Sequence, residues 1–457
     1  MLRLHDTALG GVAEVEPRDP GRFSMYVCGP TVYDVPHLGH GRSVLVYDVL
    51  RRYLEWRGFE VVHVSNVTDI DDQIIRRAGE EGRSPEEVAA HYEKVYWEAM
   101  DRLGVARPTI TPHATEYVQR MVELIGDLVA SGAAYESTDG VYLSVEQVDG
   151  YGLLAHQPLS SLRAGARVEV DEAKRSPVDF ALWKKAKPGE PAWESPWGPG
   201  RPGWHTECVV MSLDLLGEGF DLHTGGLDLV FPHHENERAQ AVAVGRRFSR
   251  HWMHHAFVEV GGEKMSKSLG NYTSLVDLLD QTDGRAYRLL VLRAHYRSPL
   301  EVTPATIADA EAGLERLDAV ARRFELGGMP PAGSSSVAGL DEEAVARFTR
   351  AMDDDLDTPA AMAVVFELLR QANSAADAGD TDRARRLAAT VAELAGAVGL
   401  ELGRAAAEVD PESAGLVARR DAARRARDFA AADALREELT ALGWVVEDGP
   451  EGTKIRR

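Results

Sequence analysis

The chain has 457 residues, of which 44% are apolar and 27% are charged, and its formal net charge is −22. This length predicts two to four domains, because one hydrophobic core rarely serves so long a chain. The acidic balance argues against general polyanion binding, so a bound nucleic acid would need a local cluster of Arg and Lys. No apolar stretch is long enough to span a membrane, and the N-terminus lacks the apolar segment of a secretory signal. Cys28 and Cys208 are the only cysteines, which indicates a reducing compartment, the cytoplasm.

The first part of the chain predicts alternating strands and helices. Residues 22–28 are typical of a short strand, and residues 60–65 of the next one. Between them, residues 40–57 place apolar side chains at helical spacing and end at a glycine. A further helix begins near Ser84, which has the sequence of a capping box. This order opens a nucleotide-binding α/β domain, in which the turn after the first strand holds the ligand.

Changes in composition divide the rest of the chain. A Gly-, Pro- and Trp-rich region interrupts the α/β pattern, an almost uncharged Gly/Pro/Ser stretch is typical of a linker, and an Ala-rich amphipathic region follows it. We therefore expect an α/β domain over 1–130 and 206–262, an insertion over 131–205, a connecting region over 263–325, a linker over 326–340, a helical bundle over 341–400 and a small module over 401–457.

A set of thiols, imidazoles and carboxylates suggests a metal site. The candidate ligands are Cys28, Cys208, His233, His234, Glu235 and Glu237. Because Pro232 predicts a helix start, His233 and Glu237 are four residues apart on one helix face. Two thiolates, one His and one Glu would make a four-coordinate Zn²⁺ site. His234 lies three residues before Glu237, so helical geometry does not exclude it, and packing is the commoner role for isolated Cys and His.

Two further motifs carry groups that suit phosphate binding. "HLGH" (37–40) places His37 and His40 at a predicted helix N-terminus, where the helix dipole favours anions, although metal ligation or a surface turn would fit equally. "GGEKMSKSLGN" (261–271) places Lys264 and Lys267 in a loop of small residues. Lysine ammoniums there suit the charge that develops on a triphosphate, and a solvated basic loop is the alternative.

These motifs, in this order, resemble the cysteinyl-tRNA synthetase family of class I aminoacyl-tRNA synthetases. The resemblance covers essentially the whole chain. "HLGH" is similar to the HIGH signature of the family, and "KMSKS" is complete. Other blocks that resemble the family are "YVCGPTVYD", "NVTDIDD" (66–72), "DFALWK" (179–184), "SPWGPGRPGWHTEC" (195–208), "FPHHENE", "HYRSPL" (295–300), "RDFAAADALREEL" (427–439) and "EDGPEGTKIRR" (447–457).

The resemblance implies a fold, a reaction and roles for residues. It implies a class I Rossmann-like catalytic domain with an inserted domain, a KMSKS and stem-contact region over 263–325, a helical bundle and a C-terminal module that recognises the anticodon. The enzyme would activate cysteine with MgATP and transfer it to the terminal ribose of tRNA(Cys), as a monomer with one zinc per chain. The implied zinc ligands are Cys28, Cys208, His233 and Glu237. The implied catalytic residues are His37, His40, Lys264 and Lys267. The implied ATP-binding residues are His37, Gly39, His40, Asp228 and Lys267. The implied cysteine-binding residues are Gly29, Thr68, Trp204 and His223, although for Trp204 packing in the core is the commoner role of a Trp.

Zinc would explain how the enzyme tells cysteine from serine. A pocket that reads shape separates substrates differing by a methylene only about 10–200-fold. A thiolate binds a thiophilic metal far better than a hydroxyl does, so no separate editing site would be needed.

The chain departs from the family pattern at two positions. Thr224 stands where the family has a glycine, and its Cβ would limit backbone approach to the adenosine, with a small expected effect on affinity. Thr206 stands where an apolar residue is usual.

The C-terminal module offers a basic surface for tRNA. Residues 418–433 predict one helix that carries Arg419, Arg420, Arg424, Arg425 and Arg427. Clustered guanidiniums in an acidic protein fit contacts to phosphates and bases. The alternative is a solvated helix whose arginines pair with neighbouring aspartates.

Two other functions share parts of these motifs. A cysteine ligase of thiol-cofactor biosynthesis would use the same sites but join cysteine to an amino sugar. A non-catalytic paralogue could bind tRNA, or sense thiols through zinc. Complete HLGH and KMSKS motifs argue against lost catalysis.

Overall fold

The computed structural model describes residues 2–161, 174–261, 263–264, 273–326, 339–403, 410–426, 428–442, 444–449 and 452–456. Within these ranges, no helix is both long and apolar enough to cross a membrane. Lys267, Arg427 and most of the expected linker over 326–340 lie outside the described residues.

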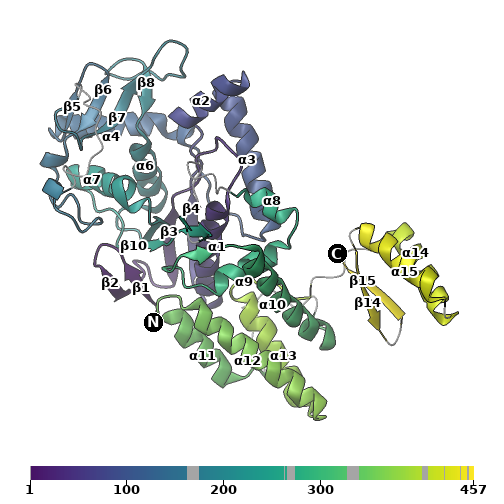
Figure 1. Cartoon of the computed structure of the whole chain (residues 1–457). Coiled ribbons are helices and arrows are strands. Elements are labelled where there is room, and N and C mark those ends of the chain that lie inside the picture. The colour runs from purple at the N-terminus through teal and green to yellow at the C-terminus, as the bar shows by residue number, and fades with distance from the viewer. Residues whose placement is uncertain are drawn as a thin grey trace.

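A four-stranded parallel sheet forms the centre of the α/β domain (Figure 1). Its order is β10 (His251–His255), β9 (Leu222–Gly226), β3 (Arg22–Val27) and β4 (Glu60–Ser65). The chain leaves β3 towards β4 on one side and leaves β9 towards β10 on the other. The strand order therefore reverses between β3 and β9, which is where ligands bind in open α/β sheets. The Rossmann-like fold expected from the sequence is confirmed.

Helices connect and cover these strands. α1 (Leu38–Trp56) joins β3 to β4, α6 (Trp204–Leu216) precedes β9, and α7 (Glu235–Ala243) joins β9 to β10 after the π-helical turn Val230–His234. The predicted helix over 40–57 starts two residues earlier, at Leu38, because the His37 side chain caps it by accepting from the His40 backbone N–H. The capping box predicted at Ser84 is present at the start of α3 (Pro85–Arg102).

The insertion is an antiparallel sheet beside the α/β domain. Its strands, in spatial order, are β5 (Ala134–Glu136), β6 (Gly140–Leu143), β7 (Phe180–Lys185) and β8 (Gly200–Pro202). Beside it lie α2 (Asp72–Glu81) and α4 (Val118–Ala130) (Figure 1). Along the chain, the 3₁₀ turn Ala114–Tyr117 precedes α4 and the 3₁₀ turn Val145–Gln147 follows β6. The core of this half joins Val64 of the central sheet to Leu182 and Trp183 of the insertion.

A second core joins α1 to the helices between Leu275 and Gly396. Its elements are α8 (Leu275–Leu279), α9 (Gly284–Leu292), α10 (Pro304–Arg323), α11 (Glu342–Asp353), α12 (Thr358–Asp377) and α13 (Thr381–Gly396). Leu45 and Tyr53 of α1 pack in one cluster with Tyr287 of α9, Phe348 of α11 and Val365 of α12. Short strands complete this half of the chain: the N-terminal hairpin β1 (Arg3–Asp6) and β2 (Gly11–Glu14), and the sheet β11 (Val258–Val260), β12 (Glu263–Lys264) and β13 (Leu300–Glu301).

The C-terminal module has its own small core. α14 (Pro411–Arg425) and α15 (Phe429–Ala441) pack together beside the hairpin of β14 (Val445–Gly449) and β15 (Gly452–Arg456) (Figure 1). Leu416, Leu439 and Trp444 meet in this core. The single helix predicted over 418–433 is wrong, because α14 ends at Arg425 and Asp428 caps a new helix by accepting from the Ala431 backbone N–H at 3.1 Å.

Candidate active site

A cavity of about 410 Å³ opens at the carboxyl ends of β3, β9 and β10. Seven of the candidates from the sequence line it: Cys28, Gly29, His37, Gly39, His40, Trp204 and Asp228. It lies where the strand order reverses, so the predicted ligand position after the first strand coincides with it. The size suits a nucleotide or a small substrate.

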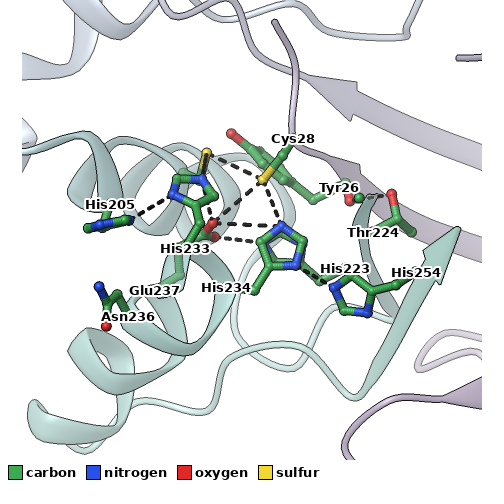
Figure 2. Close-up of polar contacts among 12 residues, drawn as sticks. Tyr26, Cys28, His205, His223, Thr224, His233, His234, Asn236, Glu237 and His254 are labelled. Atoms are coloured by element: carbon green, nitrogen blue, oxygen red, sulfur yellow. Dashed lines mark hydrogen bonds and ion pairs between the residues drawn. The ribbon is translucent and has the colours of Figure 1, made fainter. Parts of the chain in front are cut away.

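The candidate zinc ligands meet beside this cavity (Figure 2), and Cys28 is the one of the four that lines it. The Cys28 and Cys208 sulfurs are 3.6 Å apart, and His233 Nε2 lies 3.0 Å from Glu237 Oε1 and 3.8 Å from Cys208 Sγ. Cys28 Sγ lies 3.5 Å from Glu237 Oε1. Tetrahedral zinc, with bonds of about 2.0–2.3 Å, spaces its ligand atoms about 3.3–3.8 Å apart. The donor atoms and three of these four distances therefore fit Zn²⁺, and the shorter His233–Glu237 distance is that of a hydrogen-bonded pair.

A second grouping shares two of these ligands. Cys28, His223, His234 and Glu237 also place their ligand atoms within 4.8 Å of one another. His234 Nε2 lies 3.2 Å from Cys28 Sγ, and His223 Nε2 lies 2.7 Å from Glu237 Oε2. The choice between His233 and His234, open at the level of the sequence, is therefore also open in the bare geometry.

The electrostatics of the ligand set favour a cation. Burial opposes ionisation of Cys208, but hydrogen bonds from Cys28 and His233 outweigh it and lower its pKa to about 6. Burial likewise opposes ionisation of Glu237, and the neighbouring His223 and His233 hold its pKa well below the usual range. Burial lowers the pKa of His233, but the Glu237 carboxylate outweighs burial and raises it to about 10. The Cys208 thiolate and the Glu237 carboxylate thus place negative charge where a cation would bind.

Aromatic and polar residues support the ligand set from both sides. The Trp204 ring stacks on the His233 ring at 3.8 Å and is 38% exposed at the cavity, so it is not a core tryptophan. Behind the ligands, His205 Nδ1 lies 2.8 Å from His233 Nδ1, and His234 Nδ1 lies 2.7 Å from His254 Nε2 (Figure 2). The sequence interpretation missed His205 and His254. His205 lies three residues before Cys208 on α6, a spacing that could have revealed it.

Two of the implied cysteine-binding residues are fully buried and do not line the cavity. Thr68 donates its hydroxyl proton to Glu207 Oε2 at 2.7 Å, and His223 bonds Glu237. Gly29 does line the cavity. A Cβ at this position would overlap the Asn66 backbone carbonyl oxygen, so packing is by itself a sufficient reason for a glycine here. Asn66, which the sequence interpretation also missed, accepts the Gly29 backbone N–H at 2.9 Å.

The HLGH histidines begin helix α1 on the cavity wall. His37 Nδ1 accepts the His40 backbone N–H at 3.3 Å, and His40 Nδ1 accepts the His37 backbone N–H at 3.2 Å. Their rings stack at 3.8 Å. Since each Nδ1 is an acceptor, each neutral ring carries its proton on Nε2, the nitrogen that points away from the helix backbone.

The structure describes two of the three remaining candidates, Asp228 and Lys264. Asp228 lies at the exposed rim of the cavity, after β9. Lys264 pairs its backbone with Glu259 in the β11–β12 ladder. Lys267 belongs to the residues that are not described.

The two threonines at atypical positions are both buried. Thr224 lies within β9, donates its hydroxyl proton to the Tyr26 carbonyl oxygen at 3.2 Å and does not line the cavity. The expected effect of Thr224 on the affinity for adenosine stays a prediction. Thr206 is fully buried in the first turn of α6.

The candidate tRNA-binding arginines divide into two groups. Arg419 and Arg425 are exposed on α14, and Arg424 is half-buried. Arg420 is buried and donates to Thr453 Oγ1 at 2.6 Å, so it holds the hairpin against α14. Its assignment as a tRNA contact is therefore wrong.

Comparison with known proteins identifies the chain as a synthetase. Residues 14–312 match the family of tRNA synthetases class I (C) catalytic domains, residues 347–403 match the DALR domain, and residues 406–456 match the cysteinyl-tRNA ligase anticodon binding domain. The cysteine–tRNA ligase of Halorhodospira halophila is 47% identical over 470 residues and that of Carboxydothermus hydrogenoformans 44% over 464, each covering 100% of both chains.

Solved structures with low sequence identity share the fold. A Mycobacterium tuberculosis methionyl-tRNA synthetase superposes with a TM-score of 0.59 at 17% identity, over 82% of this chain and 89% of that one. A LeuRS of Agrobacterium radiobacter K84 gives 0.61 at 12% identity, over 84% and 85%. The full-length similarity to its curated relatives shows that this chain belongs to the cysteine–tRNA ligase family of class I synthetases.

Proposed function

We propose that this ligase selects cysteine with a zinc ion held by Cys28, Cys208, His233 and Glu237, and charges tRNA(Cys). The observation that carries the proposal is the meeting of these four ligand atoms beside a cavity that Cys28 lines together with the HLGH histidines. We choose His233 over His234 because its set uses both thiols, and because His233 stacks on a cavity residue, Trp204. The family resemblance assigns the same four positions.

Selection depends on the difference between sulfur and oxygen. When bound there, zinc would favour a substrate thiolate over the hydroxyl of serine. The protein residues bring the substrate to that position: Trp204, stacked on His233, and Gly29, next to Cys28, both line the cavity. Thr68 and His223 act from beneath, by holding Glu207 and Glu237 in place.

Activation of the amino acid requires charge neutralisation more than acid–base chemistry. The cysteine carboxylate is itself the nucleophile that attacks the α-phosphate of ATP, and pyrophosphate leaves. His37 and His40 present Nε2–H donors at the N-terminus of α1, where the helix dipole adds positive potential. MgATP is the nucleotide substrate, and Lys264 and Lys267 stabilise the pyrophosphate as it leaves. Gly39 allows close approach of the phosphates. Asp228, at the rim of the cavity, binds the ribose.

The exposed Arg419 and Arg425 of α14 and the half-buried Arg424 bind the tRNA. We also propose that one chain carries the whole reaction as a monomer. It acts in the cytoplasm, where Cys28 and Cys208 stay reduced and available to a metal.

The test compares acceptors. The purified protein, with its zinc content measured, is given radiolabelled cysteine, MgATP and either tRNA(Cys) or an amino sugar. Charging of tRNA(Cys) alone, at one zinc per chain, supports the proposal. Transfer to the amino sugar, or charging by protein without zinc, contradicts it. The match of residues 406–456 to an anticodon binding domain already disfavours the amino-sugar acceptor.

A further inference from the structure

A second histidine, His205, contacts the His233 ring on the side that faces away from the other candidate ligands. Its Nε2 faces Glu237 at 3.0 Å and Cys208 at 3.8 Å, and its Nδ1 faces His205 Nδ1 at 2.8 Å (Figure 2). A hydrogen bond between two ring nitrogens contains one proton, so one ring donates and the other accepts. The direction of this bond decides which nitrogen of His233 is available to a metal.

Only one direction suits zinc at the proposed site. An imidazole that binds a metal through Nε2 carries its proton on Nδ1, so His233 must donate to His205. His205 Nδ1 must then be unprotonated, and the neutral His205 ring carries its proton on Nε2. We propose that His205 is a positioning residue, which accepts this bond and thereby fixes the tautomer and ring plane of His233 for zinc. The inference rests on the proposed zinc site.

The fold holds His205 firmly enough for this role. It lies in the first turn of α6, three residues before Cys208, so one helix supplies a ligand and the support of another ligand. Gln240, on the helix that carries Glu237, donates to the His205 carbonyl oxygen at 2.8 Å. The Phe180 ring meets the His205 ring edge-on, at 5.4 Å and 84°. The helix that carries Glu237 therefore holds the His205 backbone, and Phe180 of β7 packs against the His205 ring.

The chain offers a matched control at the competing histidine. His254 contacts His234 Nδ1 at 2.7 Å, as His205 contacts His233, and both supporting rings lie outside the two ligand groupings. Removing His205 should weaken a site built on His233, whereas removing His254 should weaken a site built on His234. The pair of variants separates the two assignments.

The experiment measures zinc release from the full-length protein. Zinc-loaded wild type, His205→Leu, His205→Gln and His254→Leu are mixed with excess chelating indicator, and the release rate is followed by absorbance. Loss of a residue that supports a metal ligand typically costs about 10–100-fold in metal affinity, so His205→Leu should release zinc about 10–100-fold faster. His205→Gln keeps an oxygen acceptor and should stay within about threefold of wild type, as should His254→Leu.

Other outcomes overturn the inference. These are wild-type release from His205→Leu, equal acceleration in the Leu and Gln variants, or acceleration in His254→Leu as large as in His205→Leu. If His205→Leu does not fold, the tautomers are read in the zinc-loaded wild type by two-bond ¹⁵N–¹H spectra of the histidine rings. A proton on His205 Nδ1 would contradict the proposal. A wild-type protein that binds no zinc would instead refute the proposed zinc site itself.

Discussion

Replacing Asp48 with asparagine should unfold the α/β domain at a much lower urea concentration. Asp48 on α1 is 2% exposed and accepts from Arg288 of α9 at 2.6 Å and from Arg52 at 2.8 Å. Arg52 is 27% exposed, so water can replace its partner at little cost. Arg288 is 1% exposed and would keep a buried, unpaired charge. Removing one partner of a buried ion pair lowers the free energy of unfolding by about 3–5 kcal/mol. Most of this loss comes from the buried guanidinium of Arg288, which loses its carboxylate.

The assay is equilibrium urea unfolding followed by far-UV circular dichroism, with Asp309→Asn as the control. Asp309 pairs with Arg293 at 2.7 Å but is 76% exposed, so its loss should cost less than about 1 kcal/mol. Arg288 and Arg52 outweigh burial and lower the pKa of Asp48 in the folded state. The Asp48 contribution is therefore present above the unfolded pKa of about 3.9 and is lost as pH falls through the folded pKa. Equal destabilisation by the two variants at pH 7, or a difference that grows below pH 4, would refute this reasoning.

Four further substitutions test the site and the tRNA surface. Cys208→Ser should raise the KM for cysteine at least about tenfold and reduce discrimination against serine to the 10–200-fold that shape alone provides; an unchanged KM for cysteine in pyrophosphate exchange contradicts the zinc role. Lys267→Ala should lower kcat more than it raises the KM for cysteine, and a pure KM effect in steady-state exchange would count against pyrophosphate stabilisation. Arg419→Ala should raise the KM for tRNA and reduce its salt dependence while leaving exchange intact, whereas Arg420→Ala should lower the melting temperature of the C-terminal module; the reverse pattern would contradict the division of these arginines.

Local sequence patterns predicted the frame of the site because they depend on neighbours in the chain. The strand at 60–65 and the capping box at Ser84 are in place, since alternation and capping are decided within a few residues. The pairing of His233 with Glu237 also follows from helical spacing.

Contacts between distant segments were beyond such patterns. Nothing local indicates that His254 meets His234, because β10 and the turn before α7 are brought together only by the sheet. The break between α14 and α15 was missed because the Ala- and Arg-rich sequence favours helix throughout, while Asp428 acts as a cap that outweighs propensity. Arg420 was assigned to the surface because a charged residue is seldom buried without a partner, and its partner Thr453 lies on a distant strand.

The most direct test of the account is cysteine-dependent ATP–pyrophosphate exchange, with serine measured in parallel, on protein that is zinc-loaded, stripped by a chelator and then reloaded. Exchange with cysteine alone, lost on stripping and restored by zinc at one ion per chain, is the predicted result. Equal exchange by stripped protein, or serine activated nearly as well as cysteine by the zinc-loaded protein, would contradict the claim that zinc selects the substrate.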